Sequence, residues 1–478
     1  MISEQTIPFR WLMFFLLLLT AGQLPSSVSA ASATSLVSSP GDSSFQEPPN
    51  ILLIVGDDMG YADTGFHGCT DIPTPHLDQL AKDGVIFTDA YVSGPYCSPT
   101  RAGLMTGRYQ QRFGHEFNPG VPDAGLPVSE VTLADRLRLA GYRTALIGKW
   151  HLGGRSQFHP QQRGFQHFFG FLGGAHDYFR SDSLLVGETP VSPKESSDHL
   201  TGDYLTDRLG NEACQLIQKF RSGEGASAAA PWFLYLAFNA VHTPMQADDA
   251  RLKKFASIAD PQRRTYAAMM SAMDDAVGQV LKTLDDTDQR RKTLILFLSD
   301  NGGPTMKGVT VNGSQNAPLR GSKRTTLEGG IRVPFLMSWP DRISAGKYQQ
   351  PVIQLDAHTT ILAAAGAAIP GDGRLDGVNL LPFLDGEANG APHEALYWRF
   401  GNQMAIRKGR FKLVRYDRNA DTLTGDRNQG VNGPFLYDLN DDIGETTDLS
   451  GKHPHEAQEL QAQWNQWNSG LVDPLWER

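Results

Sequence analysis

The sequence is poor in cysteine, in long apolar runs and in charge of one sign, and each shortage excludes a class of protein. Three cysteines, Cys69, Cys97 and Cys214, are too few for a disulfide framework in 478 residues, although Cys69 and Cys214 remain able to pair. The 43 basic and 52 acidic residues give a net charge of −9, which argues against a general binder of nucleic acid or anionic membranes. A local basic pocket is still compatible with this balance.

The longest unbroken apolar run lies near the N-terminus and has the features of a targeting segment. Arg10 precedes apolar residues 11–19, and small residues follow, ending in Val28-Ser29-Ala30. The run is too short to span a membrane, and no second stretch reaches membrane length. We therefore expect a signal peptide over residues 1–30, a Ser-rich flexible linker over 31–47 and an exported protein with no membrane association after signal removal. An interfacial N-terminal anchor is the alternative.

Short apolar runs alternate with amphipathic stretches over most of the chain, and this alternation predicts an α/β fold. Continuous apolar runs without polar alternation are typical of parallel strands buried on both faces. We expect a catalytic domain over residues 48–388 built on a large, doubly wound, mostly parallel sheet. Strands are expected at 51–55, 144–147, 233–238, 294–298 and 335–338. Helices are expected at 74–83, 133–140, 205–220 and 266–284.

The sequence pattern changes after residue 384, where the segments that resemble strands become shorter and contain more polar residues. We expect a smaller C-terminal α+β subdomain over residues 389–478, with an antiparallel sheet and a closing helix at 455–467. Its strands are expected at 395–400, 404–406, 412–416 and 435–439.

Two polar pairs follow two of the predicted buried strands. Asp57-Asp58 comes one residue after the first strand, and Asp300-Asn301 comes one residue after the strand at 294–298. Ligands of open α/β sheets bind at the carboxyl ends of strands, so these pairs meet if the strands are neighbours. Clustered carboxylates require a cation, and oxygen ligands favour Ca²⁺ or Mg²⁺ over zinc. Ordinary turn chemistry is the alternative for either pair alone.

Residues Cys97-Ser98-Pro99-Thr100-Arg101 place a thiol at the start of a predicted helix. Ser98 is a good N-cap, Pro99 a good first helical residue, and Gly107 a good C-cap. The side chain of Cys97 would then face the positive end of the helix, with Arg101 as an added cation. The alternative is a buried structural cysteine.

This pentapeptide resembles the Cys-x-Pro-x-Arg signature of the formylglycine-dependent, arylsulfatase-like sulfatases, which have the alkaline phosphatase superfamily fold. Residues 104–108 continue the resemblance, and residues 141–153 resemble the second signature of the family. The likeness extends from about residue 48 to the C-terminus. It implies that a formylglycine-generating (sulfatase-maturing) enzyme oxidises Cys97 to an aldehyde. It also implies a metal site, usually for Ca²⁺ with Mg²⁺ possible, whose ligands are Asp57, Asp58, Cys97, Asp300 and Asn301.

The resemblance also assigns catalytic roles to basic side chains that follow the predicted strands. The residues implied are Cys97, Arg101, Lys149, His151, His242 and Lys323. In the implied mechanism a hydroxyl of the aldehyde hydrate attacks sulfur, and Lys149 and Lys323 hold the sulfate. His242 protonates the leaving alcohol and His151 deprotonates the second hydroxyl. On local sequence alone each histidine could be structural, and the neighbouring Arg324 leaves the position of Lys323 uncertain by one residue.

The function expected is hydrolysis of sulfate monoesters, with a sulfated carbohydrate as substrate and no nucleic-acid partner. Stretches 108–116 and 174–178 are candidates for lining the pocket, or equally for scaffold loops. One alternative is a formylglycine-dependent phosphonate monoester hydrolase or phosphodiesterase, and another is a non-catalytic binder of sulfated glycans. Because animal lysosomal sulfatases are richer in cysteine, we expect a bacterial periplasmic or secreted enzyme.

Overall fold

The computed structural model describes residues 47–120, 123–191, 204–222, 230–305, 311–417 and 431–476. The predicted signal peptide and nearly all of the predicted linker lie outside these residues. Among the described helices, none combines the length and the apolar character needed to cross a membrane.

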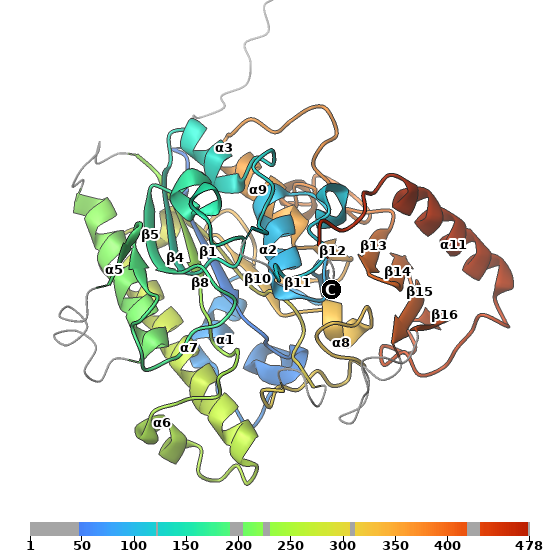
Figure 1. The fold of residues 1–478 in the computed structure, drawn as a ribbon, viewed down its shortest axis with the longest axis horizontal. Coiled ribbons are helices and arrows are strands. Elements are labelled where there is room, and N and C mark those ends of the chain that lie inside the picture. The colour runs from blue at the N-terminus through green and yellow to red at the C-terminus, as the bar shows by residue number, and fades with distance from the viewer. Residues whose placement is uncertain are drawn as a thin grey trace, which may run out of the picture. The chain divides into compact units, whose positions relative to one another are not determined.

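A ten-stranded sheet forms the centre of the fold, in the order β11-β2-β10-β9-β1-β8-β4-β5-β6-β7 (Figure 1). Its five adjacent strands from β9 to β5 are parallel. These are β9 (Thr293–Ser299), β1 (Asn50–Gly56), β8 (Trp232–Ala237), β4 (Arg143–Lys149) and β5 (His167–Phe171). The outer strands are β10 (Phe335–Ser338), β2 (Val85–Phe87), β11 (Gly346–Tyr348), β6 (Leu185–Val186) and β7 (Thr189–Pro190). All five predicted strands are present, and β10 runs antiparallel to β9.

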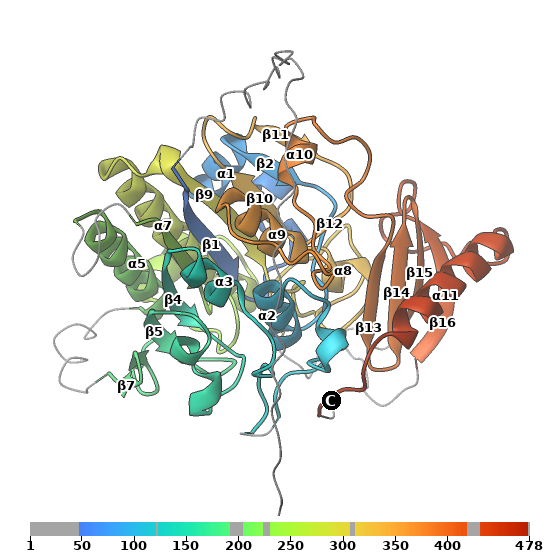
Figure 2. The same cartoon turned by 90° about the horizontal axis from the view of Figure 1, so that it is seen from above.

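Helices cover both faces of this sheet, as predicted for a doubly wound fold (Figure 2). Alternate side chains of β1 point to opposite faces, so Leu52 and Ile54 enter one core while Ile51 and Leu53 enter the other. The first core is closed by α1 (Pro75–Lys82), α5 (Leu205–Ser222) and α7 (Pro261–Asp286). The second is closed by α2 (Cys97–Thr106), α3 (Leu133–Leu139) and α9 (Leu355–Ala364). The methionines of α7, Met269, Met270 and Met273, lie in the first core.

A four-stranded antiparallel sheet follows near the C-terminus, as expected, and lies at the right of Figure 1. It consists of β13 (Leu396–Phe400), β14 (Gln403–Lys408), β15 (Phe411–Asp417) and β16 (Val431–Asp438). One face packs, through residues such as Trp398 and Val414, against Tyr91 and Leu327 of the preceding part of the chain. The other face is covered by α11 (Pro454–Ser469), whose Leu460 is buried against it. The domain boundary at residue 388 stays a prediction.

The remaining elements are short. Two brief strands, β3 (Ala90–Tyr91) and β12 (Val352–Ile353), pair with each other, and three short helices are α6 (Asp249–Lys254), α8 (Glu328–Ile331) and α10 (Leu381–Leu384). Turns of 3-10 helix lie at Tyr61–Asp63, Gly65–His67, Gln110–Phe113, Ser156–Phe158, Pro160–Gln162 and Arg290–Lys292.

The start of α2 differs from the prediction. The backbone N–H of Thr100 donates to the carbonyl of Tyr96 (3.1 Å), so the helix begins at Cys97 with Tyr96 as its N-cap. Ser98 is therefore not the cap; its own N–H is satisfied by the side chain of Asn118 (3.0 Å). The predicted C-cap is correct, because Gly107 adopts the left-handed conformation (φ 70°).

Helix α9 was not predicted from the sequence, because its residues are apolar on most sides and lack the one-sided periodicity of a surface helix. Cys69 and Cys214 are both free, so the pairing left open above does not form.

Candidate active site

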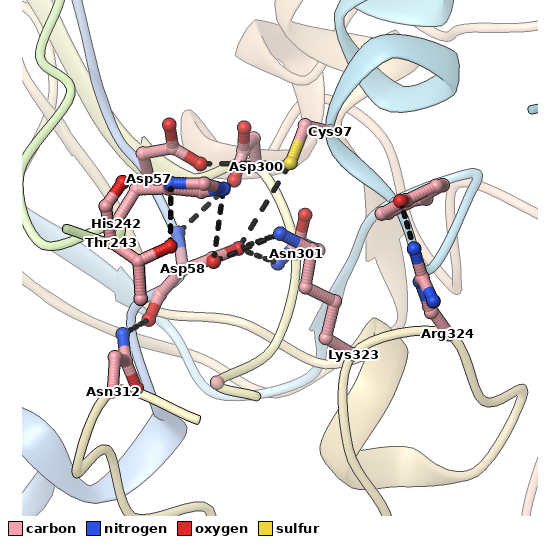
Figure 3. A network of polar contacts seen from close by, with 12 residues as sticks. Asp57, Asp58, Cys97, His242, Thr243, Asp300, Asn301, Asn312, Lys323 and Arg324 are labelled. Atoms are coloured by element: carbon pink, nitrogen blue, oxygen red, sulfur yellow. Dashed lines mark hydrogen bonds and ion pairs between the residues drawn. The ribbon is translucent and has the colours of Figure 1, made fainter. Parts of the chain in front are cut away.

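The two polar pairs meet at the carboxyl edge of the sheet, because β1 and β9 are neighbours in parallel register (Figure 3). The backbone N–H of Asp58 donates to Oδ1 of Asp300 (3.3 Å), and the amide of Asn301 donates to Oδ1 of Asp58 (2.8 Å). All four side chains are buried. The topology therefore gathers three carboxyl groups and an amide in one place that water reaches poorly.

The backbone at Asp58 is held in an uncommon conformation. Its φ is 64°, in the left-handed region that residues with a Cβ rarely adopt. The buried side chain of Asn312 stabilises this turn by donating to the carbonyls of both Asp58 and Val241, at 3.0 Å each. Sequence analysis missed Asn312, which lies in an ordinary Asn-Gly-Ser turn and is brought to the site only by tertiary structure.

Cys97 lies at the same edge, brought there by the first turn of α2 (Figure 3). Its Sγ lies 3.6 Å from Oδ1 of Asp57 and 4.0 Å from Oδ1 of Asp58. Burial raises the pKa of the thiol to about 12, although the charges of Lys149 and Lys323 act in the opposite direction. The sulfur is therefore protonated at neutral pH, and an unmodified Cys97 is a poor nucleophile.

Three buried cations face the three carboxylates. Nζ of Lys149 lies 2.5 Å from Oδ2 of Asp57, and Nζ of Lys323 lies 2.6 Å from Oδ1 of Asp58. The guanidinium of Arg101 contacts Oδ2 of Asp300 at 2.9 Å through both Nε and one terminal nitrogen. The charges thus balance before any ligand binds. Lys323 reaches the cluster, whereas the side chain of Arg324 does not (Figure 3).

The carboxyl groups differ in their affinity for protons. Burial acts to raise the pKa of Asp58, but the Lys323 ammonium, followed by His242 and Asn301, lowers it to about 2. Burial and the neighbouring Asp57 charge raise the pKa of Asp300 to about 6, with Arg101 opposing the rise. Asp58 is therefore an anion at neutral pH, whereas Asp300 takes up a proton at a higher pH than Asp58 does.

His242 points into the cluster from the loop after β8. Its Nε2 lies 3.6 Å from Oδ2 of Asp58, while its Nδ1 bonds the carbonyl of Thr243 (2.7 Å). The hydroxyl of Tyr178 holds this loop by donating to the carbonyls of Asn239 (2.7 Å) and His242 (2.8 Å). Burial lowers the pKa of His242 to about 4, although Asp58 opposes the shift, so the ring is neutral in the ligand-free protein.

His151 lies two residues after the end of β4, is half-buried and adopts a left-handed conformation (φ 58°). Its carbonyl accepts a hydrogen bond from the Ser98 hydroxyl (2.6 Å), whose oxygen also lies 2.6 Å from Nε2 of His115. Burial, and then the charges of Lys149 and Arg101, hold the pKa of His151 well below its usual range. Ser98, to which sequence analysis gave only a capping role, and His115, from the candidate pocket stretch 108–116, therefore link α2 to this histidine.

The side chains gathered here can hold a metal ion. Asp57, Asp58, Cys97 and His242 each offer a ligand atom within 4.8 Å of one another. Oδ1 of Asn301 is buried without a hydrogen-bond partner, and an unsatisfied oxygen beside two carboxylates suits Ca²⁺ or Mg²⁺. Asp300 is not in this group, and its two oxygens are engaged by Arg101 and by the N–H of Asp58. Its role as a ligand stays a prediction.

The two candidate pocket stretches contribute mainly to the scaffold. In the first, Arg108 pairs with Glu130 (2.7 Å) and Arg112 with Asp376 (2.6 Å). In the second, Gly174 lies against the ring of His151: a Cβ added at Gly174 would come within 2.6 Å of Nε2.

The fold agrees with comparisons to known proteins. The sulfatase family profile matches residues 49–367, and the profile of the N-sulphoglucosamine sulphohydrolase C-terminal region matches residues 321–468. The chain belongs to the sulfatase family and is a sulfuric ester hydrolase.

Individual relatives align over most of their length. The human N-acetylgalactosamine-6-sulfatase is 34% identical over 86% of this chain and 83% of its own. Arylsulfatase A of Bos taurus is 34% identical over 84% and 83% of the two chains. The crystal structure of Ps i-CgsB in complex with k-i-k-neocarrahexaose is 35% identical, with a TM-score of 0.79 over 90% of this chain and 94% of the other.

Proposed function

We propose that this protein hydrolyses sulfate monoesters of a sulfated carbohydrate through a formylglycine at position 97 and a divalent ion, releasing inorganic sulfate. The observation that carries the proposal is a buried, protonated thiol set among three carboxylates and three cations. A protonated thiol is a poor nucleophile, whereas an aldehyde at this position would supply the hydroxyl groups of its hydrate. The proposal also requires a maturing enzyme that converts Cys97.

The substrate class is supported by the relatives. Two of them are named with a carbohydrate: one is an N-acetylgalactosamine-6-sulfatase, and the other is Ps i-CgsB in complex with k-i-k-neocarrahexaose. The apolar run at residues 11–19 and the small residues ending at Ala30 support export. An exported sulfatase would meet sulfated polysaccharides outside the cell or in the periplasm, and we propose a bacterial host.

The side chains of this protein would bind and orient the ester. Lys149 and Lys323 would bind the sulfate oxygens, leaving their present partners Asp57 and Asp58 to the ion, and Arg101 would hold Asp300 and position 97 in place. A formylglycine supplies a hydrated aldehyde with one hydroxyl that attacks sulfur and a second whose deprotonation releases sulfate. His151, kept neutral by its surroundings, would accept that proton.

His242 would protonate the leaving oxygen. Its pKa of about 4 in the ligand-free protein is too low for this task at neutral pH. An anionic ester bound next to the ring would raise this pKa, because a nearby negative charge favours the protonated form. Proton uptake by His242 would thus be coupled to substrate binding.

The ion would be held by Asp57, Asp58, Asp300 and Asn301 with the side chain at position 97. When bound, it supplies positive charge close to the reacting sulfate group. Because the protein's own charges already cancel, a dication makes the site net positive and favours an anionic ester.

A substitution at position 97 tests the proposal directly. Cys97→Ala should abolish sulfate release, with circular dichroism and melting temperature close to those of the unsubstituted protein. Mass spectrometry of the peptide that contains residue 97 should show the aldehyde in active protein from the native host. Full activity of Cys97→Ala, or an unmodified thiol in fully active protein, would contradict the mechanism.

Removal of divalent ions tests the metal. Dialysis against a chelator should abolish turnover and lower the melting temperature, since three carboxylates lose a bound cation. Adding Ca²⁺ or Mg²⁺ back separately should restore activity and identify the preferred ion. Activity that survives complete metal removal would refute this part of the proposal.

A further inference from the structure

Arg324 is the charged residue next to the cluster that the proposed reaction does not use. It directly follows Lys323, but Figure 3 shows its side chain directed away from the carboxylates that Lys323 contacts. Its backbone is left-handed (φ 74°), a conformation that favours glycine and is costly for arginine. A backbone outlier at the edge of an active site suggests a functional constraint.

The conformation of Arg324 is fixed from two sides. Its N–H donates to the carbonyl of Pro95 (2.7 Å), and its own carbonyl accepts from the side chain of Gln403 on β14 (2.8 Å). The guanidinium lies 4.6 Å from the centre of the Tyr96 ring and donates to the hydroxyl of that residue. Tyr96 immediately precedes Cys97, so the guanidinium is held by the residue that comes directly before the nucleophile position.

The guanidinium has hydrogen-bonding capacity to spare. Within the described part of the chain no carboxylate pairs with it, and its Nε is buried without a hydrogen-bond partner. The side chain is half-buried, unlike an arginine solvated on an open surface. Arg101, Arg108 and Arg112, by contrast, each contact a carboxylate. A half-buried cation without a counter-ion is suited to an anion supplied by a ligand.

The ring of Tyr96 links this cation to the sulfate site. Nζ of Lys323 lies 5.4 Å from the centre of the same ring that Arg324 contacts. Two cations in contact with one aromatic ring, one of which binds the reacting sulfate in the proposed function, can bind two anionic groups of a single substrate. The planar guanidinium is matched in shape to a sulfate or carboxylate.

We propose that Arg324, held by Tyr96, is a specificity-determining residue that binds a second anionic group of the substrate. The substrate class is then a sulfated carbohydrate that bears a further sulfate or a carboxylate near the scissile ester. This inference rests on the proposed function and deepens it.

The experiment compares three substrates in protein with verified modification at position 97. The first is a neutral disaccharide that carries one sulfate. The second is the same disaccharide with a second sulfate, and the third carries one sulfate and has a uronate in place of the unsulfated sugar. The variants are Arg324→Gly, which removes the charge and suits the left-handed backbone, and Arg324→Lys, which keeps the charge. Arg138→Ala is the control, because Arg138 is exposed at the end of α3 that precedes β4, at the opposite edge of the sheet.

Arg324→Gly should lower the preference in kcat/KM for a doubly anionic substrate over the monosulfated one by about tenfold, mainly through KM. Arg324→Lys should retain part of the preference, and Arg138→Ala all of it. Comparison of the substrate that has a second sulfate with the substrate that has a uronate shows which anionic group is recognised. An unchanged preference in Arg324→Gly would overturn the inference, as would an equal loss on all three substrates, which would indicate that Arg324 only supports Tyr96.

Failure of the proposed function gives a different result. In that case the unsubstituted protein would release sulfate from none of the three substrates. The affinities of the same disaccharides, measured by calorimetry on the same variants, then still test Arg324: the inference requires that Arg324→Gly weaken binding of the doubly anionic ligands selectively.

Discussion

At the scale of single residues, the site depends on groups that hold a catalytic side chain without reacting themselves. Asn312 holds the left-handed turn at Asp58, Ser98 bonds the carbonyl of His151, and Gly174 leaves room for the His151 ring. Each of these features sets the position of Asp58 or His151, to which the proposed function assigns a role. Displacements of about 1 Å in such positions can cost about 100-fold in rate.

Gly174 offers a test of this idea with a matched neighbour. Gly174→Ala should lower kcat by about 10- to 100-fold, because the new methyl group would lie within 2.6 Å of Nε2 of His151 and displace the ring. Gly173→Ala is the control, since the nearest atom to its added Cβ lies 3.9 Å away. Steady-state kinetics and thermal melting of both variants distinguish ring displacement from unfolding. Equal kcat in the two variants would contradict the assigned role of His151.

At the scale of elements, α9 is attached to the segment before the small sheet by a buried ion pair. Asp356 in its first turn accepts from Nε2 of His393 (2.8 Å) and from the backbone N–H groups of Ile353 and Val378 (2.8 Å each). Burial opposes protonation of His393, but the charge and hydrogen bond of Asp356 outweigh it and raise the pKa of the ring.

This raised pKa predicts a pH dependence of stability. The folded protein holds the proton of His393 more tightly than the unfolded chain does. The pair therefore contributes its full stability below the unfolded pKa, about 6.5, and loses it as the pH rises through the folded pKa. Urea midpoints measured from pH 5 to pH 9 should fall more steeply for the unsubstituted protein than for His393→Gln. His455→Gln, at an exposed position of α11, is the control and should follow the unsubstituted protein.

At the scale of the whole molecule, the described residues from 48 to 476 are joined by buried polar contacts as well as by apolar packing. Lys412 of β15 is fully buried, with Nζ 2.8 Å from Glu328 of α8 and 2.9 Å from Glu445. Arg407 of β14 donates to the hydroxyl of Tyr91, and the indole of Trp398 donates to the carbonyl of Val92 (2.7 Å). The small sheet is thereby fixed against the segments that carry Tyr96 and Lys323.

Removal of one buried partner should therefore destabilise the protein strongly. Lys412→Met should lower the free energy of unfolding by about 3–5 kcal/mol, because the buried Glu445 loses its paired cation and Glu328 keeps only Arg332 (3.3 Å). Lys408→Met is the matched control: its ion pairs with Glu394 and Glu459 are exposed and should contribute at most about 1 kcal/mol. Denaturant unfolding followed by tryptophan fluorescence measures both. Equal destabilisation by the two variants would contradict this account.

Much of the site was predictable because its residues lie in local patterns. Buried parallel strands have continuous apolar sequences, so the strands before Asp57, Lys149, His242 and Asp300 could be located. The carboxyl edge of a parallel sheet then predicts where their side chains converge. The cysteine motif and the following signature marked the family. Helix α9 was missed because it is apolar on most sides, and the predicted N-cap at Ser98 was wrong because a distant residue, Asn118, supplies that contact.

The sequence by itself therefore determined the family, the order of the strands along the chain and the set of candidate reactive residues, since these depend on motifs and short-range periodicity. Tertiary structure alone decided that Asn312 supports Asp58, that Lys323 reaches the carboxylates while Arg324 turns to Tyr96, and that Ser98 bonds His151. These contacts join segments far apart in the chain or depend on backbone angles of single residues. No local pattern encodes such pairings, because they are set by the packing of the whole sheet and its loops.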